Sequence, residues 1–381
     1  MNQIENIKKG VIVLGGHVQA LGIIRILGNE NIPSILLDDS HINIARFSKY
    51  CGDFFLYSDL MKKLIELGKL EKYKNWLILP TNDFHVSEIS KNKKELLKYF
   101  KVGSDDWSNI EKFYNKKNAY KIAKKIGIDI PETWFPKSID DLPVHSINYP
   151  CIIKPAVMHK FYKITKKKVF ICNNKQELLN NYKKALKVIS SNEILIQDII
   201  PGSSENLYSA CFTFDKEKSL VQLVCRRKRQ HPVNFGNATT FAETFRDEKL
   251  IEISEKLLKE VKYDGICEVE YKFDKRDQRY KFLEINTRTW KWHSISIKSK
   301  SPFLISYYNK CYNLEKIVKL NFEDASFKHI ITDVPTSFKM ILMGIYKKTI
   351  IRNVQYATWN KKDILPAIME LLILPYLIFK R

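Results

Sequence analysis

The chain has 381 residues, of which 45% are hydrophobic and 12% aromatic, enough to fill the cores of two or three lobes and to exclude general disorder. Its 64 lysines and arginines against 42 aspartates and glutamates leave a formal charge of +22, which suits phosphates, anionic substrates, nucleic acid or a membrane surface without choosing among them. Seven cysteines without a CxxC spacing argue against a zinc site and favour reduced thiols in a cytoplasmic protein.

The N-terminal part of the chain alternates between short apolar runs and segments with helical spacing. A helix is predicted at residues 20–27, and strands are predicted at residues 11–14, 34–37 and 76–79. This alternation predicts a parallel sheet covered by helices, an α/β arrangement. A Gly-Gly turn follows the first run, but the glycines lack the GxGxxG spacing, so a nicotinamide cofactor is disfavoured.

A strand-rich region follows from Asn115. A helix is predicted from Lys116 to Ile126, where Gly127 ends it, and Pro131 begins the next strand. Further strands are predicted at residues 151–154, 169–172, 194–197, 207–214, 220–226, 265–273 and 280–285, with helices at residues 175–188 and 248–261. We therefore expect a mainly antiparallel α+β body that does not continue the first sheet.

Two of these strands carry oxygen-bearing side chains at alternate positions. Glu268 and Glu270 share one face of the first strand, and Glu284, Asn286 and Arg288 share one face of the second. If the two strands pair, Glu270 and Glu284 come together. Two carboxylates and an amide oxygen suit Mg²⁺, and the arginine suits charge on a transferred phosphoryl group. The alternative is an exposed hairpin face with alternating charges.

The order and spacing of Glu270, Glu284, Asn286 and Arg288 resemble the metal-binding end of the ATP-grasp family. Three other segments resemble motifs of that family in the same order: the lysine, helix and turn of residues 115–131, the strand PCIIKP at residues 150–155, and the hinge QDIIPG at residues 197–202. Chance does not explain four motifs in one order. The resemblance covers most of the chain.

The resemblance implies roles in binding Mg-ATP. Lys116 and Lys154 would contact the phosphates, and the other nucleotide-binding residues would be Asp198, Ile199, Ile200 and Glu205. The metal ligands would be Glu270, Glu284 and Asn286, with Mg²⁺ as the expected metal and Mn²⁺ as the alternative. The catalytic residues would be Lys154 and Arg288, of which the arginine would steady an acyl phosphate.

The resemblance also divides the chain into four parts. Residues 1–112 would form the α/β domain that precedes the ATP-grasp lobes, and residues 113–198 the small lobe. Residues 199–325 would form the large lobe with the metal site, and residues 326–381 a helical C-terminal extension. One departure concerns the segment after Lys154, which lacks the glycines that cover the phosphates in many members. Lysines that would replace those backbone amides are Lys160, Lys163 or Lys168.

A run of four cations at residues 226–229 is the candidate site for the substrate. On a strand Arg227 and Arg229 share one face, and their predicted role is to capture the substrate carboxylate or the acyl phosphate. A solvated charge run or a nucleic-acid patch is the alternative. This run, the Phe235-Gly236 pair and the Trp-Lys-Trp run at residues 290–292 resemble the carboxylate–amine ligase branch, associated with tailoring of bacterial surface polysaccharides or peptides.

The resemblance implies a cytoplasmic, ADP-forming ligase that activates a carboxylate as an acyl phosphate and couples it to an amine. Its partners would be a small-molecule or sugar-linked carboxylate and an amine, without nucleic acid. Residues 364–379 are apolar but broken by two prolines and a glutamate, too short to span a bilayer. They suit a helix packed on the body or a peripheral membrane contact with Lys380 and Arg381 at its edge. The competing functions are a non-catalytic ATP-binding protein and a basic protein of nucleic acid or membrane surfaces.

Overall fold

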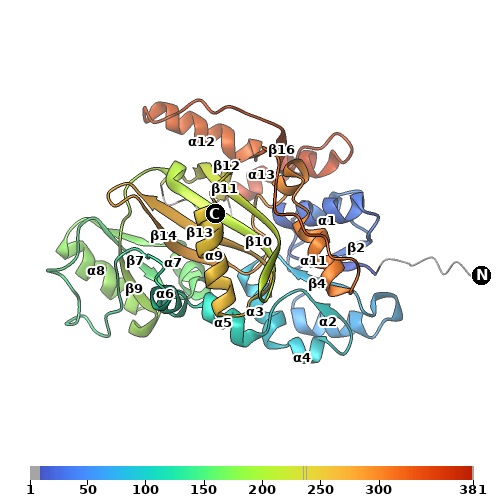
Figure 1. Ribbon diagram of the computed structural model, residues 1–381, viewed down its shortest axis with the longest axis horizontal. Coiled ribbons are helices and arrows are strands. Elements are labelled where there is room, and N and C mark those ends of the chain that lie inside the picture. The colour runs from blue at the N-terminus through green and yellow to red at the C-terminus, as the bar shows by residue number, and fades with distance from the viewer. Residues whose placement is uncertain (1–8, 235, 237, 380–381) are drawn as a thin grey trace, which may run out of the picture.

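The computed structural model describes residues 9–379 except 235 and 237, and it arranges them in lobes built on three sheets (Figure 1). Phe235 of the predicted substrate motif and the terminal Lys380 and Arg381 lie outside the described residues. The helices of the first lobe are α1 (Val18–Asn29), α2 (Leu60–Gly68), α3 (Asp83–Lys91), α4 (Lys93–Leu96) and α5 (Trp107–Tyr114), with short 3₁₀ turns η1 (Ala45–Phe47) and η2 (Glu71–Tyr73).

The first lobe contains the parallel sheet that the sequence predicts. Its strands, in the order in which they lie side by side, are β3 (Phe54–Leu56), β2 (Ser34–Asp38), β1 (Val11–Leu14), β4 (Leu77–Pro80) and β5 (Lys101–Val102). All of β1 and β4 is buried because helices cover both faces, which is why these strands read as unbroken apolar runs. The α/β expectation for this lobe is confirmed.

A small antiparallel sheet follows, in the order β6 (Thr133–Trp134), β9 (Ile194–Asp198), β7 (Cys151–Pro155) and β8 (Phe170–Cys172). The helices and turn of this region are α6 (Lys116–Lys125), α7 (Met158–Thr165), α8 (Lys175–Leu186) and η3 (Ser191–Glu193). The glycine-poor segment after β7, which the sequence leaves without a structure, is therefore largely the helix α7. Its buried Phe161 packs in the apolar core of this lobe.

The large lobe is built on a seven-stranded sheet. In sheet order its strands are β14 (Arg279–Asn286), β13 (Asp264–Asp274), β10 (Leu207–Asp215), β11 (Lys218–His231), β12 (Ala238–Phe245), β15 (Ser326–Lys328) and β16 (Val354–Tyr356). Its helices and turn are η4 (Ser204–Asn206), α9 (Glu248–Glu260), α10 (Ile295–Ser299) and α11 (Phe303–Cys311). All its pairings are antiparallel except that of β15 with β16, which confirms a mainly antiparallel body.

The C-terminal part differs from the expected helical extension, because β15 and β16 join the sheet of the large lobe. Two helices accompany them, α12 (Ile330–Leu342) and α13 (Leu365–Phe379), which lie along the same side of the molecule in Figure 1. Just before α13, the carboxylate of Asp363 accepts a hydrogen bond from Arg25 Nε of α1 at 2.8 Å, and both side chains are buried. Among the described residues, no helix is long and apolar enough to cross a membrane.

Candidate active site

The strands β13 and β14 form the predicted hairpin. Glu270 lies directly opposite Glu284, and Glu268 lies opposite Asn286. Opposite residues of an antiparallel pair share a face, so all four side chains line one surface. Asn286 Nδ2 donates to Glu268 Oε2 at 2.9 Å and to Glu270 Oε1 at 3.0 Å. The pairing expected from the sequence is therefore confirmed, and we call these four residues the carboxylate cluster.

Cations from several elements surround the carboxylate cluster. Lys116 Nζ at the start of α6 lies 2.9 Å from Glu284 Oε2, and Arg227 Nη2 of β11 donates to Glu270 Oε2 at 3.0 Å. The ammonium of Lys116 is the main reason why the pKa of Glu284 is held well below its usual range. Burial opposes the charge on Lys116, but Glu284 outweighs it and raises the pKa of that lysine.

Glu268 is the most buried member of the carboxylate cluster, with 2% of the residue exposed. Burial first, and then the neighbouring charge of Glu270, raise its pKa to about 8. The oxygens of the carboxylate cluster are hard donors, and a divalent cation suits such a set. Among the described residues, no three His, Cys, Asp or Glu side chains are grouped to hold a metal ion unaided. The predicted ligands are instead two carboxylates and an amide, completed by phosphate oxygens.

Lys154 reaches the same region from the small lobe. Its ammonium, on the buried strand β7, donates to Tyr120 Oη at 2.7 Å. Tyr120, on α6, in turn donates to the carbonyl of Leu283 on β14 at 2.8 Å. The charge of Lys154 also contributes to the low pKa of Glu284. Both predicted phosphate-binding lysines are therefore gathered at the carboxylate cluster.

The predicted hinge follows β9 and contacts β13. Asp198 ends β9, and burial raises its pKa while Asn148 Nδ2 donates to Oδ2 at 3.3 Å. The carbonyl of Ile200 accepts a hydrogen bond from Lys272 Nζ of β13 at 2.6 Å. Lys272 stands two positions from Glu270, so their side chains share a face of β13 and the hinge lies beside the sheet that carries the carboxylate cluster.

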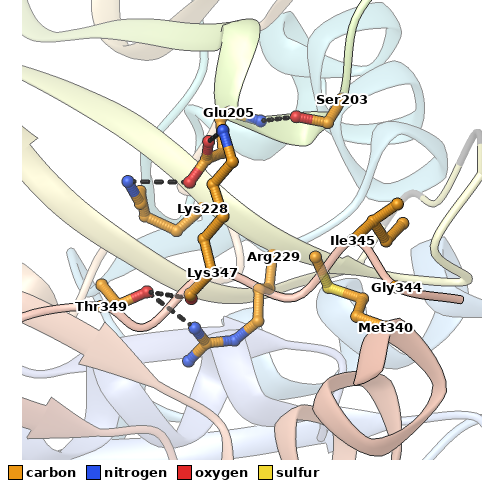
Figure 2. Close-up of a pocket in the computed structure, with 9 residues that line it drawn as sticks. All are labelled: Ser203, Glu205, Lys228, Arg229, Met340, Gly344, Ile345, Lys347 and Thr349. Atoms are coloured by element: carbon orange, nitrogen blue, oxygen red, sulfur yellow. Dashed lines mark hydrogen bonds and ion pairs between the residues drawn. The ribbon is translucent and has the colours of Figure 1, made fainter. Parts of the chain in front are cut away.

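Glu205, the predicted ribose ligand, lies in a different cluster. It lines a cavity of about 330 Å³, and Figure 2 shows its carboxylate beside two lysines. Lys228 Nζ lies 2.9 Å and Lys347 Nζ 3.5 Å from its oxygens. Burial would raise the pKa of Glu205, but the hydrogen bond and charge of Lys228 lower it. The cavity is lined jointly by the loop before β10, by β11 and by the segment after α12, so the C-terminal part reaches this residue.

The expectation that Arg227 and Arg229 face one site is wrong. The pairing of β11 with β12 shifts register on both sides of Arg229, and such a bulge breaks the two-residue alternation. Arg229 Nε and Nη2 donate to the two carboxylate oxygens of Asp333 on α12 at 2.7 and 2.9 Å. Nη1 donates to Thr349 Oγ1 at 2.9 Å. Arg227 faces the carboxylate cluster, whereas Arg229 is buried in a structural ion pair.

Arg288 connects the carboxylate cluster to the first lobe. Its Nη2 donates to Asn286 Oδ1 at 3.0 Å, and its Nε donates to Asp83 Oδ1 at 2.7 Å. Asp83 begins α3, directly after the carboxyl end of β4. Sequence reasoning missed Asp83, although the carboxyl end of a parallel strand is a usual place for a functional residue. Gln19 of α1 makes a second bridge, since its Nε2 donates to the carbonyls of Thr81 and Thr289 at 2.9 and 2.8 Å.

Of the three lysines considered for the phosphate lid, Lys168 is the one whose charge is coupled to the site. Desolvation lowers its pKa, while the charges of Glu284 and Glu270 partly restore it. Lys160 and Lys163 lie on α7 and are exposed. Lys168, in the loop after α7, is therefore the one of these three lysines whose pKa reflects the charges of the carboxylate cluster.

Comparison with known proteins agrees with this geometry. Residues 115–301 match the family described as the ATP-binding domain of the carbamoyl-phosphate synthase L chain. The D-aspartate ligase of Enterococcus faecium (strain Aus0004) is 25% identical over 313 residues, which are 76% of this chain and 73% of that one.

Solved structures share the fold at low sequence identity. The biotin carboxylase domain of Hydrogenobacter thermophilus 2-oxoglutarate carboxylase, solved with MgADP and bicarbonate, has a TM-score of 0.68 at 16% identity and covers 84% of this chain and 74% of its own. The L-amino acid ligase of Bacillus licheniformis has a TM-score of 0.62 at 12% identity, and the match covers 80% of this chain and 74% of the ligase. The N5-carboxyaminoimidazole synthetase of Staphylococcus aureus, solved with ADP, has a TM-score of 0.64 at 16% identity. This match covers 84% of this chain and 82% of the synthetase.

Residues 115–301 therefore match an ATP-grasp ATP-binding domain, in the part of the chain where the four motifs lie. This match and the D-aspartate ligase relative support an ATP-dependent, ADP-forming ligase of a carboxylate and an amine, and they leave its substrates unspecified.

Proposed function

We propose that the carboxylate cluster is the catalytic centre at which this protein forms an acyl phosphate from ATP and a carboxylate and then couples it to an amine. The observation that carries the proposal is the convergence of Lys116, Lys154, Arg227 and Arg288 on Glu270, Glu284 and Asn286. Cations from four separate elements meet one oxygen-rich face. Phosphoryl transfer needs this arrangement, because a triphosphate and a carboxylate repel each other as they approach.

Each residue has a distinct role in this proposal. Lys116 and Lys154 hold phosphate oxygens as point charges, and Arg288 steadies the transferred group with its planar fork. Glu270, Glu284 and Asn286 would hold Mg²⁺ or Mn²⁺, which when bound supplies neutralisation of the phosphate charge. Arg227, at the edge of the carboxylate cluster, would receive the substrate carboxylate. Residues 198–200 of the hinge would hold the adenine, and Glu205 would hold the ribose.

For the substrates we propose a small-molecule or sugar-linked carboxylate and an amine, used in tailoring a bacterial surface polysaccharide, a peptide or a small metabolite. The D-aspartate ligase relative supports an amino acid as one of the two. We place the reaction in the cytoplasm, and the proposal includes a peripheral membrane contact of the C-terminal part. A screen for ADP release over pairs of carboxylates and amines would identify the substrates, because ATP is consumed whichever pair is used.

The sharpest test of the catalytic centre is Glu284→Gln. We expect Mg-ATP turnover to fall on the order of a hundredfold or more, because a phosphate-facing metal ligand loses its charge. Glu66→Gln is the matched control, since Glu66 pairs with a lysine on an exposed helix, at 2.6 Å from Lys63. Thermal unfolding would verify that both variants fold. Wild-type turnover in a folded Glu284→Gln variant would refute the metal assignment, and tight ATP binding without ADP release for any substrate pair would indicate a non-catalytic nucleotide sensor.

A further inference from the structure

Helix α12 has two faces of opposite character. Asp333, Thr336 and Met340 point into the body and are buried. The opposite face carries large apolar side chains in water, of which Val334 is 58%, Phe338 62% and Leu342 72% exposed. Positions four apart lie on one side of a helix, and Ile330 and Ile341 extend the same stripe. Contiguous apolar side chains of this extent on a surface usually mark an interaction site.

The chain after α12 also exposes large apolar side chains. Met343, Ile345, Tyr346, Ile350 and Ile351 are all exposed apolar or aromatic side chains, and Ile350 is 73% exposed. On α13 the exposed apolar or aromatic side chains include Leu365, Ile368, Leu371, Leu372 and Tyr376. The two helices are joined near the start of α12, where the ring nitrogen Nε2 of His329 lies 2.7 Å from Glu370 Oε1. Figure 1 shows α12, α13 and the chain between them along one side of the molecule.

The charges on this surface are mainly positive. Between Asp333, which is buried against Arg229, and Asp363, which is buried against Arg25, the sequence contains no aspartate or glutamate. Within that stretch the exposed cations are Lys339, Lys347, Lys348, Arg352, Lys361 and Lys362. Two of them have carboxylate partners from outside the stretch: Arg352 lies 3.7 Å from Asp324, and Lys347 lies 3.5 Å from Glu205. Apolar side chains flanked mainly by lysine and arginine match an anionic lipid surface, because its acyl boundary accepts the apolar side chains and its headgroups attract the cations.

We propose that α12 and the segment after it, residues 330–352, form a docking surface for an anionic membrane. The buried face of α12 stays on the sheet of the large lobe while Phe338, Leu342 and Ile350 enter the headgroup boundary. This docking does not depend on the ligase reaction. Lys347 belongs both to the docking surface and to the lining of the cavity at Glu205. Docking would therefore bring the C-terminal side of that cavity next to the lipid surface.

The test uses the full chain with vesicles of phosphatidylglycerol and phosphatidylcholine, and with phosphatidylcholine alone, in a sedimentation assay. We expect binding to the anionic vesicles that weakens with salt, and little binding to the neutral ones. Phe338→Ser with Leu342→Ser should abolish binding. Lys339→Gln with Lys348→Gln should weaken it at least tenfold, since each cation near an anionic surface contributes about fivefold.

Two control variants separate this surface from general effects of composition. Leu97→Ser removes an exposed apolar side chain of the first lobe, and Lys183→Gln with Lys184→Gln removes two exposed lysines of α8. Both should bind vesicles like the wild type, and far-ultraviolet circular dichroism should show that every variant is folded. Failure of the wild type to sediment with anionic vesicles, or an equal loss in the controls, would overturn the proposal.

Two further measurements distinguish the other outcomes. Sedimentation velocity without lipid would show whether a second copy covers this surface, and a dimer lost in Phe338→Ser with Leu342→Ser would also overturn membrane docking. ADP release, followed in parallel, should be unchanged in the docking variants. Vesicle binding without ADP release would count against the ligase alone, and ADP release without vesicle binding would count against docking alone.

Discussion

At the scale of single residues, His85 shows how burial sets a charge state. Its ring lies inside the first lobe, with Nε2 at 2.7 Å from Tyr57 Oη, and burial lowers its pKa to about 4. The unfolded chain has the ordinary value of 6.5. Between these two values the unfolded state binds a proton that the folded state does not, so this contribution to stability is complete above about pH 6.5 and is lost as the pH falls towards 4.

His85→Gln should therefore make the stability of the protein less sensitive to acid. Between pH 7 and about pH 4.5, the free energy of unfolding of the wild type should fall by about 2 to 3 kcal/mol more than that of the variant. The figure follows from about 1.4 kcal/mol for each unit of difference between the folded and unfolded pKa. Urea unfolding at both pH values measures this difference. The exposed His145→Gln serves as control, and equal acid sensitivity of His85→Gln and the wild type would contradict the assignment.

Single positions also show what a sequence can and cannot reveal. Alternation along two strands was enough to bring Glu270 and Glu284 together, because the hairpin between them is local. Alternation failed for Arg229, because a bulge changes the direction of a side chain without leaving a recognisable local pattern. Asp83 could not be assigned to the site, since its contact with Arg288 joins residues that lie far apart in the sequence.

At the scale of elements, Tyr120 couples three of them. Its hydroxyl accepts from Lys154 on β7 and donates to the carbonyl of Leu283 on β14, while the residue itself belongs to α6. The position of Lys154, for which we propose a role in phosphate binding, therefore depends on one buried hydroxyl. We therefore expect α6, β7 and β14 to move together.

Tyr120→Phe removes only that hydroxyl. We expect a loss of about 1 to 3 kcal/mol of stability, because a buried ammonium and a buried carbonyl lose a partner, together with a several-fold increase in the KM for ATP. Tyr182→Phe is the matched control, since its buried hydroxyl donates to the carbonyl of Pro136 at 3.3 Å in the small lobe. The control should lose stability but keep its KM. An unchanged KM in Tyr120→Phe would show that Lys154 does not depend on this contact.

Element prediction succeeded for long or strongly patterned segments and failed for short ones. The central parallel strands β1 and β4 are apolar throughout, which marks them clearly, whereas the short β3 and β5 were not predicted. Strands β15 and β16 have three residues each, too few for a period to show, so their place in the large sheet comes only from tertiary pairing. The sequence left the segment of α7 without a predicted structure, and in the fold its apolar Phe161 anchors a helix in the small lobe.

At the scale of the whole molecule, a buried ion pair joins the two ends of the chain. Arg25 of α1 donates to Asp363 and to the carbonyls of Thr358 and Asp363, at 2.7 to 2.8 Å. Asp363 also accepts from the hydroxyl of Ser48 and the amide of Lys49, at 2.8 and 2.9 Å. The first lobe and the C-terminal part are therefore held together by one buried polar cluster.

Asp363→Ala should destabilise the protein by about 3 to 5 kcal/mol, because it leaves the Arg25 guanidinium buried without its counter-charge. Arg25→Met in addition to Asp363→Ala should recover much of that loss, since the uncompensated charge is then gone. Chemical denaturation of both single variants and the double variant gives the coupling between the two positions. Additive losses would mean that the two side chains do not stabilise each other.

The pairing of β15 with β12, and of β16 with β15, has a practical consequence for anyone who shortens this protein. A truncation placed where the family match ends, near residue 301, would strip these last strands away and leave the backbone amides and carbonyls along one side of β12 unsatisfied. Such a bare edge invites strands of other molecules to add to it, so the fragment is expected to aggregate on expression. Recombinant fragments should therefore retain the chain through Tyr356 to keep both strands, and through Asp363 to keep the partner of Arg25.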